Sequence, residues 1–195
     1  MSFFNQNRWT NIILPLVCTF LLSSCFATTT SQGPPPMAKR SGVAPKAAML
    51  PVHNTNDQAI ADYVTNDLAK CLEERNVFDF VPQEKVLKAV REGNYDMSKI
   101  FGLSAAEYKA LASKLGVKYT IHGVVTIKKT LTFKGWRKDI DVYIYINEAS
   151  TGIKVDSWRS MTEFSFGSID TVVNAKKMAK AAANHICAKM IERSY

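Results

Sequence analysis

The sequence contains little that catalysis requires. It has only three histidines, His53, His122 and His185, and none lies beside a cysteine or carboxylate at the spacing of a zinc site. It also lacks a glycine-rich phosphate loop and a Gly-x-Ser-x-Gly nucleophile elbow. We therefore expect a protein that is not an enzyme and that holds no metal or cofactor, with His122 a packed residue. A hydrolase or a metal-binding protein is the rival class.

No apolar run of the sequence is long enough for a permanent membrane-spanning helix. The run at 12–22 falls short of the roughly 20 apolar residues that a span needs. Arg8 is the only charged residue before Cys25, so the start of the chain is typical of a secretory signal peptide. Leu22-Ser23-Ser24-Cys25 resembles the bacterial lipobox. This resemblance implies cleavage between Ser24 and Cys25 and lipid on Cys25; the alternative is an ordinary secretory signal with a coincidental cysteine.

The lipid on Cys25 is the only non-protein group that we expect. Each buried CH₂ contributes roughly 0.8 kcal/mol, so two or three acyl chains hold a protein stably on a membrane. In the lipoprotein sorting pattern, an aspartate after the cysteine retains the protein in the inner membrane, and here Phe26 stands at that place. We therefore expect an outer-membrane protein anchored at the periplasmic face.

Three segments of different composition follow one another along the chain. We expect a signal peptide at 1–24, the lipidated cysteine with a flexible tether at 25–46, and one globular domain at 47–195. The tether is rich in Pro, Ser, Thr and Gly and poor in core-forming residues. The formal net charge of +8 indicates a generic basic surface, or one that favours anionic lipid or polysaccharide. Nothing indicates a nucleic-acid partner.

Two of the four cysteines need an explanation beyond the signal and the anchor. Cys18 is removed with the signal peptide and Cys25 takes the lipid. Cys71 and Cys187 remain, both on apolar stripes of expected helices. An oxidising periplasm permits a disulfide between them, and two buried free thiols are the alternative.

Hydrophobic periodicity and capping signals predict a single α/β (α+β) domain. Thr55 with Gln58, and Ser104 with Glu107, fit capping boxes. The strand 140–147 is apolar on both faces and is expected to be central. The predicted order is β-α-β-α-α-β-β-β-α, a single mixed sheet flanked by helices. The expected strands are 47–52, 77–81, 119–131, 140–147 and 155–166, with helices near 56–76, 83–92, 105–115 and 169–190.

One segment stands out as a candidate interaction loop. Phe133, Trp136, Arg137 and Lys138 fall between two long expected strands, where we predict a turn. An exposed aromatic side chain flanked by cations suits a membrane interface, a sugar or a partner protein. The alternative is that Trp136 folds back onto the core.

Several pieces of the domain resemble a known superfamily in their order and spacing. The chain resembles periplasmic lipoproteins related to the N-terminal domain of TolB, which include CsgG, LpoB and PelC. The pieces that carry this resemblance are 48–54, 81–87, 112–123 and 148–152.

The resemblance implies a TolB-N-terminal-like fold and a function by protein–protein interaction. The partner would be a component of an envelope secretion system, and assembly with further copies of the chain is an option. The alternative is an LpoB-like activator of a peptidoglycan synthase, a penicillin-binding protein. The chain is too short for a CsgG-type pore, and its tether is shorter than we expect for a synthase activator.

Overall fold

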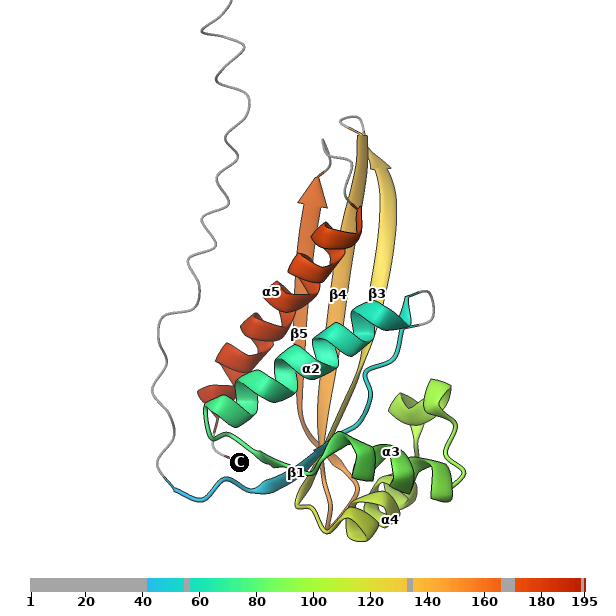
Figure 1. The fold of residues 1–195 in the computed structure, drawn as a ribbon, viewed down its shortest axis with the longest axis vertical. Helices are drawn as coiled ribbons and strands as arrows, with labels where there is room; N and C mark the ends of the chain where they lie inside the picture. Colours follow the sequence, from blue (N-terminus) through green and yellow to red (C-terminus); the bar gives the residue numbers. More distant parts are fainter. Residues whose placement is uncertain (1–41, 55–56, 133–134, 166–170, 194) are drawn as a thin grey trace, which may run out of the picture. The chain divides into compact units, whose positions relative to one another are not determined.

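A five-stranded mixed sheet forms the centre of the domain, in the order β2-β1-β3-β4-β5 (Figure 1). The computed structural model describes residues 42–195, apart from 55–56, 133–134, 166–170 and 194, and apart from the side chains of 97–98, 132–138, 163–165 and 171–175. β1 pairs in parallel with β2 and β3, and β3, β4 and β5 pair antiparallel. The strands are β1 (Lys46–Met49), β2 (Asp79–Phe80), β3 (Tyr119–Thr132), β4 (Gly135–Glu148) and β5 (Lys154–Ser165). The expected α+β class and order of elements are confirmed.

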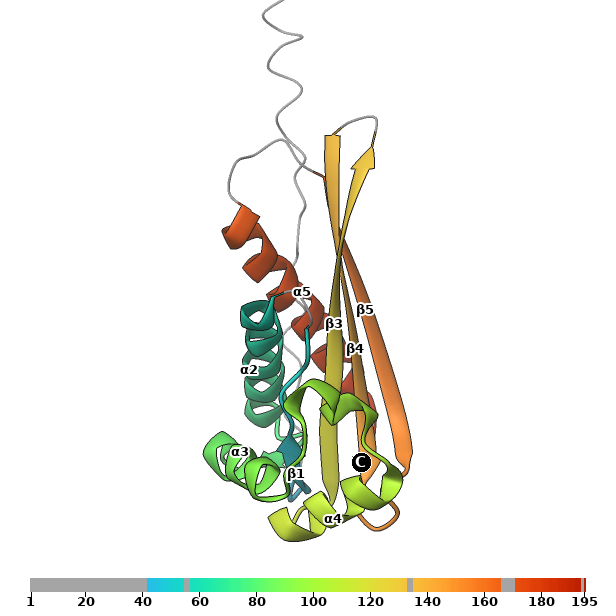
Figure 2. The same cartoon turned by 90° about the vertical axis from the view of Figure 1, so that its right-hand side faces the viewer.

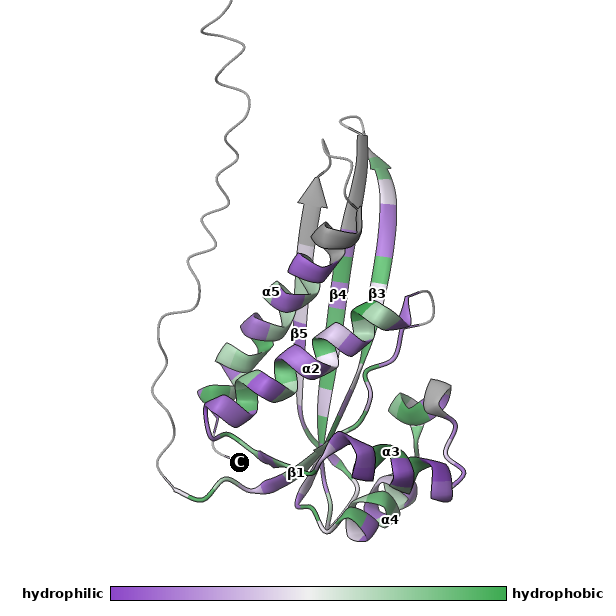
Figure 3. Cartoon of the chain, in the orientation of Figure 1, coloured by the Kyte–Doolittle hydropathy of each residue, from purple (hydrophilic) through white to green (hydrophobic). Residues whose placement is uncertain are grey.

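Two helices lie side by side across one face of this sheet, which we call the covered face (Figure 1). They are α2 (Gln58–Glu74) and α5 (Thr171–Ile191). Hydrophobic and hydrophilic residues alternate along both helices, as the colours of Figure 3 show. Their apolar sides pack on alternate residues of β4, all of them fully buried: Ile140, Val142, Ile144 and Ile146. Full burial of one such side chain stabilises a fold by about 1.5–3 kcal/mol, so this cluster is the main core.

The structure joins Cys71 of α2 to Cys187 of α5. Their Cα atoms are 6.3 Å apart, within the range that a disulfide spans. Cys187 is fully buried, and Cys71 packs against the same core. The two helices of the covered face are therefore placed for a cross-link, and we predict that it forms.

A second, smaller set of helices gathers at one end of the sheet (Figure 2) and packs on the face of β1 opposite α2 and α5. These are α3 (Gln83–Glu92), the 3₁₀ helix η1 (Met97–Gly102) and α4 (Ala105–Leu115). Their core cluster reaches the sheet at Ala48 and Leu50, on and just after β1. The long strands β4 and β5 extend beyond these helices, so most of this face has no helix over it among the described residues.

The helix ends show one correct and one wrong expectation. Ser104 caps α4 in a capping box with Glu107, as expected, and Gly116 ends the helix in the left-handed region at φ 66°. α2 is capped by Asp57, whose carboxylate accepts from the N–H of Ile60, so its expected capping box is wrong. The expected cap, Thr55, lies outside the described residues.

The expected turn at the far end of β3 and β4 is shorter than we predicted. The two strands pair without interruption up to Thr132 and Gly135. Trp136, Arg137 and Lys138 therefore lie in β4 and not in a turn. Because the pairing reaches Thr132 and Gly135, a turn over 133–138 is excluded.

Candidate binding site on the open face of the sheet

The face opposite α2 and α5, along β3, β4 and β5, carries a different class of side chain. We call it the open face. Because side chains alternate along a strand, the residues between the core positions of β4 point this way. On β3 and β4 these are Thr120, His122, Val124, Thr126, Lys128, Asp139, Asp141, Tyr143, Tyr145 and Asn147, and on β5 Ser157, Arg159 and Met161. Polar, aromatic and charged groups predominate here, whereas the covered face of β4 is entirely aliphatic over Ile140–Ile146.

An ion pair fixes the middle of the open face. The guanidinium of Arg159 donates from Nε to Oδ1 of Asp141 at 2.9 Å and from Nη2 to Oδ2 at 2.7 Å. The hydroxyl of Tyr143 donates to the same carboxylate at 3.0 Å, and the guanidinium carbon lies 5.0 Å from the Tyr143 ring centroid. Arg159 holds the pKa of Asp141 below its usual range. An arginine and a tyrosine are thus held in one geometry on the surface, and both types are enriched where interfaces gain most of their affinity.

A hollow of about 540 Å³ lies at the end of the open face nearest α4. We call it the aromatic pocket. Its walls come from η1, α4, β3 and the β4–β5 hairpin, which are far apart in the sequence. They are formed by Phe101, Leu103, Ala105, Tyr108, His122, Val124, Tyr145, Asn147, Gly152, Ile153 and Lys154.

His122 and Tyr108 form the inner wall of the aromatic pocket. Their rings stack at 4.6 Å, and Tyr145 lies 5.3 Å from the His122 ring. The Tyr108 hydroxyl donates its single proton to the carbonyl of Ile100 at 2.6 Å. His122 Nδ1 lies 3.1 Å from that hydroxyl oxygen and donates to it in the Nδ1–H tautomer of the ring. Burial lowers the pKa of His122 to about 4, so the ring is neutral near pH 7.

Asn147 leaves an acceptor unused at the floor of the same pocket. Its side chain lies close to His122 and raises the pKa of that ring, against the larger lowering by burial. Its Oδ1 nevertheless has no hydrogen-bond partner of good geometry among the described residues, although Asn147 is only 4% exposed. The hydroxyl of Thr120, opposite it on β3, is likewise buried without a partner. A buried polar atom without a partner costs about 1–3 kcal/mol, so a ligand that donates to Asn147 Oδ1 would gain from binding here.

The β4–β5 hairpin is seated on α4, which makes the aromatic pocket preformed. Gly152 has φ +70°, and a Cβ at this position would overlap the carbonyl oxygen of Ala105. The N–H of Ala149 donates to the carbonyl of Lys118 at 2.8 Å. Only glycine allows this close approach. The contact and the hydrogen bond hold the hairpin against α4.

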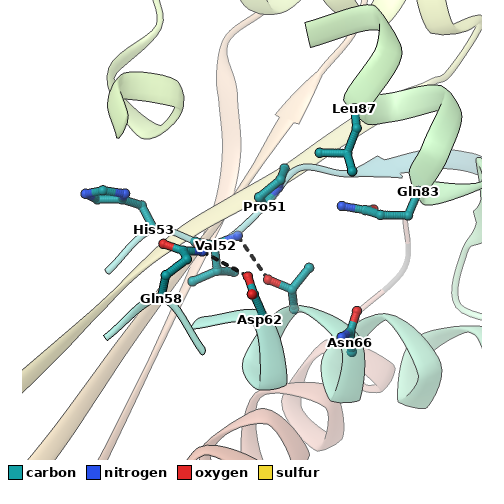
Figure 4. A pocket seen from close by; sticks show the side chains of 9 residues that line it. Pro51, Val52, His53, Gln58, Asp62, Asn66, Gln83 and Leu87 are labelled. Atoms are coloured by element: carbon teal, nitrogen blue, oxygen red, sulfur yellow. Dashed lines mark hydrogen bonds between the residues drawn. The ribbon is translucent and has the colours of Figure 1, made fainter. Parts of the chain in front are cut away.

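A second hollow, of about 560 Å³, lies between α2, α3 and the segment after β1 (Figure 4). Its polar groups bind one another. Gln58 Nε2 donates to the carbonyl of Val52 at 3.0 Å and to Asp62 Oδ1 at 2.9 Å, and the N–H of Val52 donates to Thr65 Oγ1 at 3.0 Å. These bonds tie the segment after β1 to α2. Because they leave no comparable unmet acceptor, the aromatic pocket is the stronger candidate for a ligand.

Few of the residues singled out in the sequence belong to this site. Ser24, Cys25 and Phe133 lie outside the described residues. His122 lies within the site, packed as expected. Tyr143 and Arg159 were missed. The signal for Tyr143 was the alternation of Tyr and Asp with Ile along β4, whereas Arg159 lies on β5. Over the part of the chain that the structure describes, no three His, Cys, Asp or Glu residues gather as a metal site would need. No described helix is long and apolar enough to cross a membrane.

The fold is shared with a solved bacterial lipoprotein. No family model matches the sequence, and no curated protein matches it. Lipoprotein GNA1162 from Neisseria meningitidis is similar in structure, with a TM-score of 0.53 and 11% identity over 73% of this chain and 97% of that one. A PelC dodecamer from Paraburkholderia phytofirmans gives 0.47 and 13%, covering 81% and 96% of the two chains. The LpoB C-terminal domain from Salmonella enterica gives 0.44 and 12%, covering 80% and 98%.

At this identity the comparison shows a shared fold alone. The similarity to the meningococcal lipoprotein carries this conclusion.

Proposed function

We propose that this chain is a lipid-anchored protein of the outer membrane, at its periplasmic face, that acts by binding a protein partner. In this role it is an assembly component of an envelope secretion system. The observation that carries the proposal is the open face, where an ion pair orders an aromatic and charged surface over which no described helix lies.

The composition of the open face supports a protein partner. Aromatic residues, Met and Arg are enriched at the centres of interfaces, and here Tyr143, Arg159 and Met161 lie on neighbouring positions of β4 and β5. Met161 is 56% exposed, although a methionine gains most from burial. A hollow beside this surface provides a place for an anchoring side chain.

Lipid on Cys25 would determine where this surface acts. A domain that binds and does not catalyse depends on meeting its partner, and an anchor with a short tether confines it near the membrane. Cys25→Ala should leave the domain folded and release the protein from the membrane fraction. Full function of the released form in cells would contradict the proposal.

The secretion role is tested by the state of assembly. Full-length protein in mild detergent is passed over a size-exclusion column with light scattering, and we expect an oligomer or a stable complex with an envelope protein. Met161→Glu should disrupt that assembly, because it places a charge on the open face. The matched control is Ala181→Glu, which adds the same charge at an exposed position of α5. A monomer that instead raises the activity of a peptidoglycan synthase would support the regulator role and contradict the secretion role.

A further inference from the structure

We propose that the aromatic pocket is a receptor for a tryptophan side chain carried in an acidic segment of the partner protein. This inference deepens the proposed function, because it names the chemistry of the partner at one end of the open face. It follows from the floor, the walls and the rim of the pocket, each of which restricts the occupant differently.

The floor requires that the occupant brings a hydrogen-bond donor. Asn147 Oδ1 is a buried acceptor without a partner of good geometry. The Thr120 hydroxyl opposite it makes no hydrogen bond to it, and in the Nδ1–H tautomer the His122 ring donates to the Tyr108 hydroxyl instead. A bound group with an N–H, as an indole has, would satisfy this acceptor. A purely apolar group would leave it buried and unpaired.

The walls favour a planar ring. Tyr108 and His122 present stacked rings whose planes differ by 24°, and Tyr145 is tilted by 33° from His122. Phe101 and Ile153 stand at the mouth with exposed fractions of 42% and 59%, so they gain burial when an apolar body enters. Offset or edge-to-face contacts between rings contribute about 0.5–1.5 kcal/mol beyond their area.

The rim sets the charge of the occupant. The ammonium of Lys154 lies 5.2 Å from the Tyr145 ring centroid and thus occupies the position over that ring which a foreign cation would take. Among the described residues, no acidic side chain lines the pocket. A guanidinium or ammonium guest is therefore repelled, whereas a carboxylate beside the ring is attracted.

The test uses three small probes, which compare the indole with a smaller ring that lacks its N–H, and the carboxylate with a neutral amide. Full-length protein in detergent is titrated with N-acetyl-tryptophan, which has both the indole N–H and a carboxylate. N-acetyl-phenylalanine lacks the N–H, and N-acetyl-tryptophanamide lacks the carboxylate. Calorimetry should show N-acetyl-tryptophan binding in the millimolar range or tighter, about tenfold weaker binding without the N–H, and about threefold weaker binding without the carboxylate.

Two variants test whether Asn147 causes the preference for the indole and Lys154 the preference for the carboxylate. Asn147→Ala should abolish the preference for tryptophan over phenylalanine, and Lys154→Gln should abolish the preference for the carboxylate, with circular dichroism checking that both remain folded. Ala181→Glu, on the covered side of the molecule, should change neither preference. Equal binding of all three probes, or no binding to the unmodified protein, would overturn the pocket assignment.

The outcome is separable from that of the proposed function. If the probes fail to bind while Met161→Glu still disrupts assembly, the pocket assignment is wrong and the open face stands. If the probes bind with the predicted preferences while Met161→Glu and Ala181→Glu behave alike, the pocket stands and the open face is not the docking surface.

Discussion

The two faces of β4 have opposite chemistry although they belong to one strand. Towards α2 and α5 the strand presents only isoleucine and valine, all fully buried over Ile140–Ile146. Towards the open face it presents Asp141, Tyr143, Tyr145 and Asn147. Stability needs the first set, because apolar burial is the dominant favourable term in folding. An open face kept only for solubility would need neither tyrosines in an ordered array nor a buried unpaired acceptor, so this face is the one available for function.

Removing the link between α2 and α5 should have the largest effect on the covered face. Cys71→Ser is expected to lower the free energy of unfolding by about 4 kcal/mol, because the disulfide would close a loop of 116 residues. Urea denaturation measures the loss. Cys187→Ser is the matched control and should cost the same, with no further loss in the double variant. Equal stability with and without reductant would mean that the two cysteines are free thiols, which intact mass would also show.

Truncating one buried side chain should come next and separates the two faces within β4. Ile144→Ala is expected to cost about 3 kcal/mol, because it leaves a cavity under α5. Tyr143→Phe, one residue away on the open face, removes only a hydroxyl that donates to Asp141 and should cost about 1 kcal/mol or less. Thermal unfolding of both variants measures the contrast. Similar losses would show that the open face is also part of the stabilising core.

Acid should weaken the fold through His122, at the covered end of the open face. Above pH 6.5 the ring is neutral in the folded and unfolded chain, so its contribution is complete. Between pH 6.5 and about 4 the unfolded chain binds a proton that the folded chain does not. The free energy of unfolding therefore falls with decreasing pH, by up to about 3 kcal/mol for this group.

His122→Gln isolates that pH dependence. The variant should lose the part of the slope between pH 6.5 and 4 that belongs to the ring, whatever its stability at pH 7. Denaturation of both proteins across this range measures the difference. An identical slope in the two would place His122 in contact with solvent and would remove the buried wall of the aromatic pocket.

The smallest effect is expected at the cap of α4. Ser104→Ala removes the hydroxyl that accepts from the N–H of Glu107 and should cost about 1 kcal/mol. Because α4 forms one wall of the aromatic pocket, hydrogen exchange should rise in its first turn more than in α2. Uniform exchange changes across both helices would mean that the two sides of the sheet do not unfold separately.

The order of elements was predictable because it rests on local signals. Periodic apolar positions, the Ser104 cap and Gly116 determine where α4 begins and ends, and alternating Ile and Val mark β4 as a strand. Its central position was also predicted. Both of its faces were judged substantially apolar, however, because a tyrosine ring is apolar whether or not a helix covers it.

What could not be predicted was which surface remains open. That depends on how far α3 and α4 reach across the sheet, and the connection between β2 and β3 takes them over β1 and the start of β3 only. The aromatic pocket was likewise not predictable. Phe101, Tyr108, His122 and Lys154 are far apart in the sequence and come together only through the packing of η1 and α4 on the sheet. Trp136 was wrongly expected in a turn. How far β3 and β4 pair depends on their register, and no short sequence motif specifies that register.

The central claim is that the partner binds the open face. Photo-crosslinking in intact cells tests it most directly, with benzoyl-phenylalanine placed singly at Met161 on β5 and at Ala181 on α5. The account predicts a discrete crosslinked product from position 161, reduced by Asn147→Ala, and none from position 181. Products from position 181 alone would place the partner on the helical side of the sheet and contradict the account.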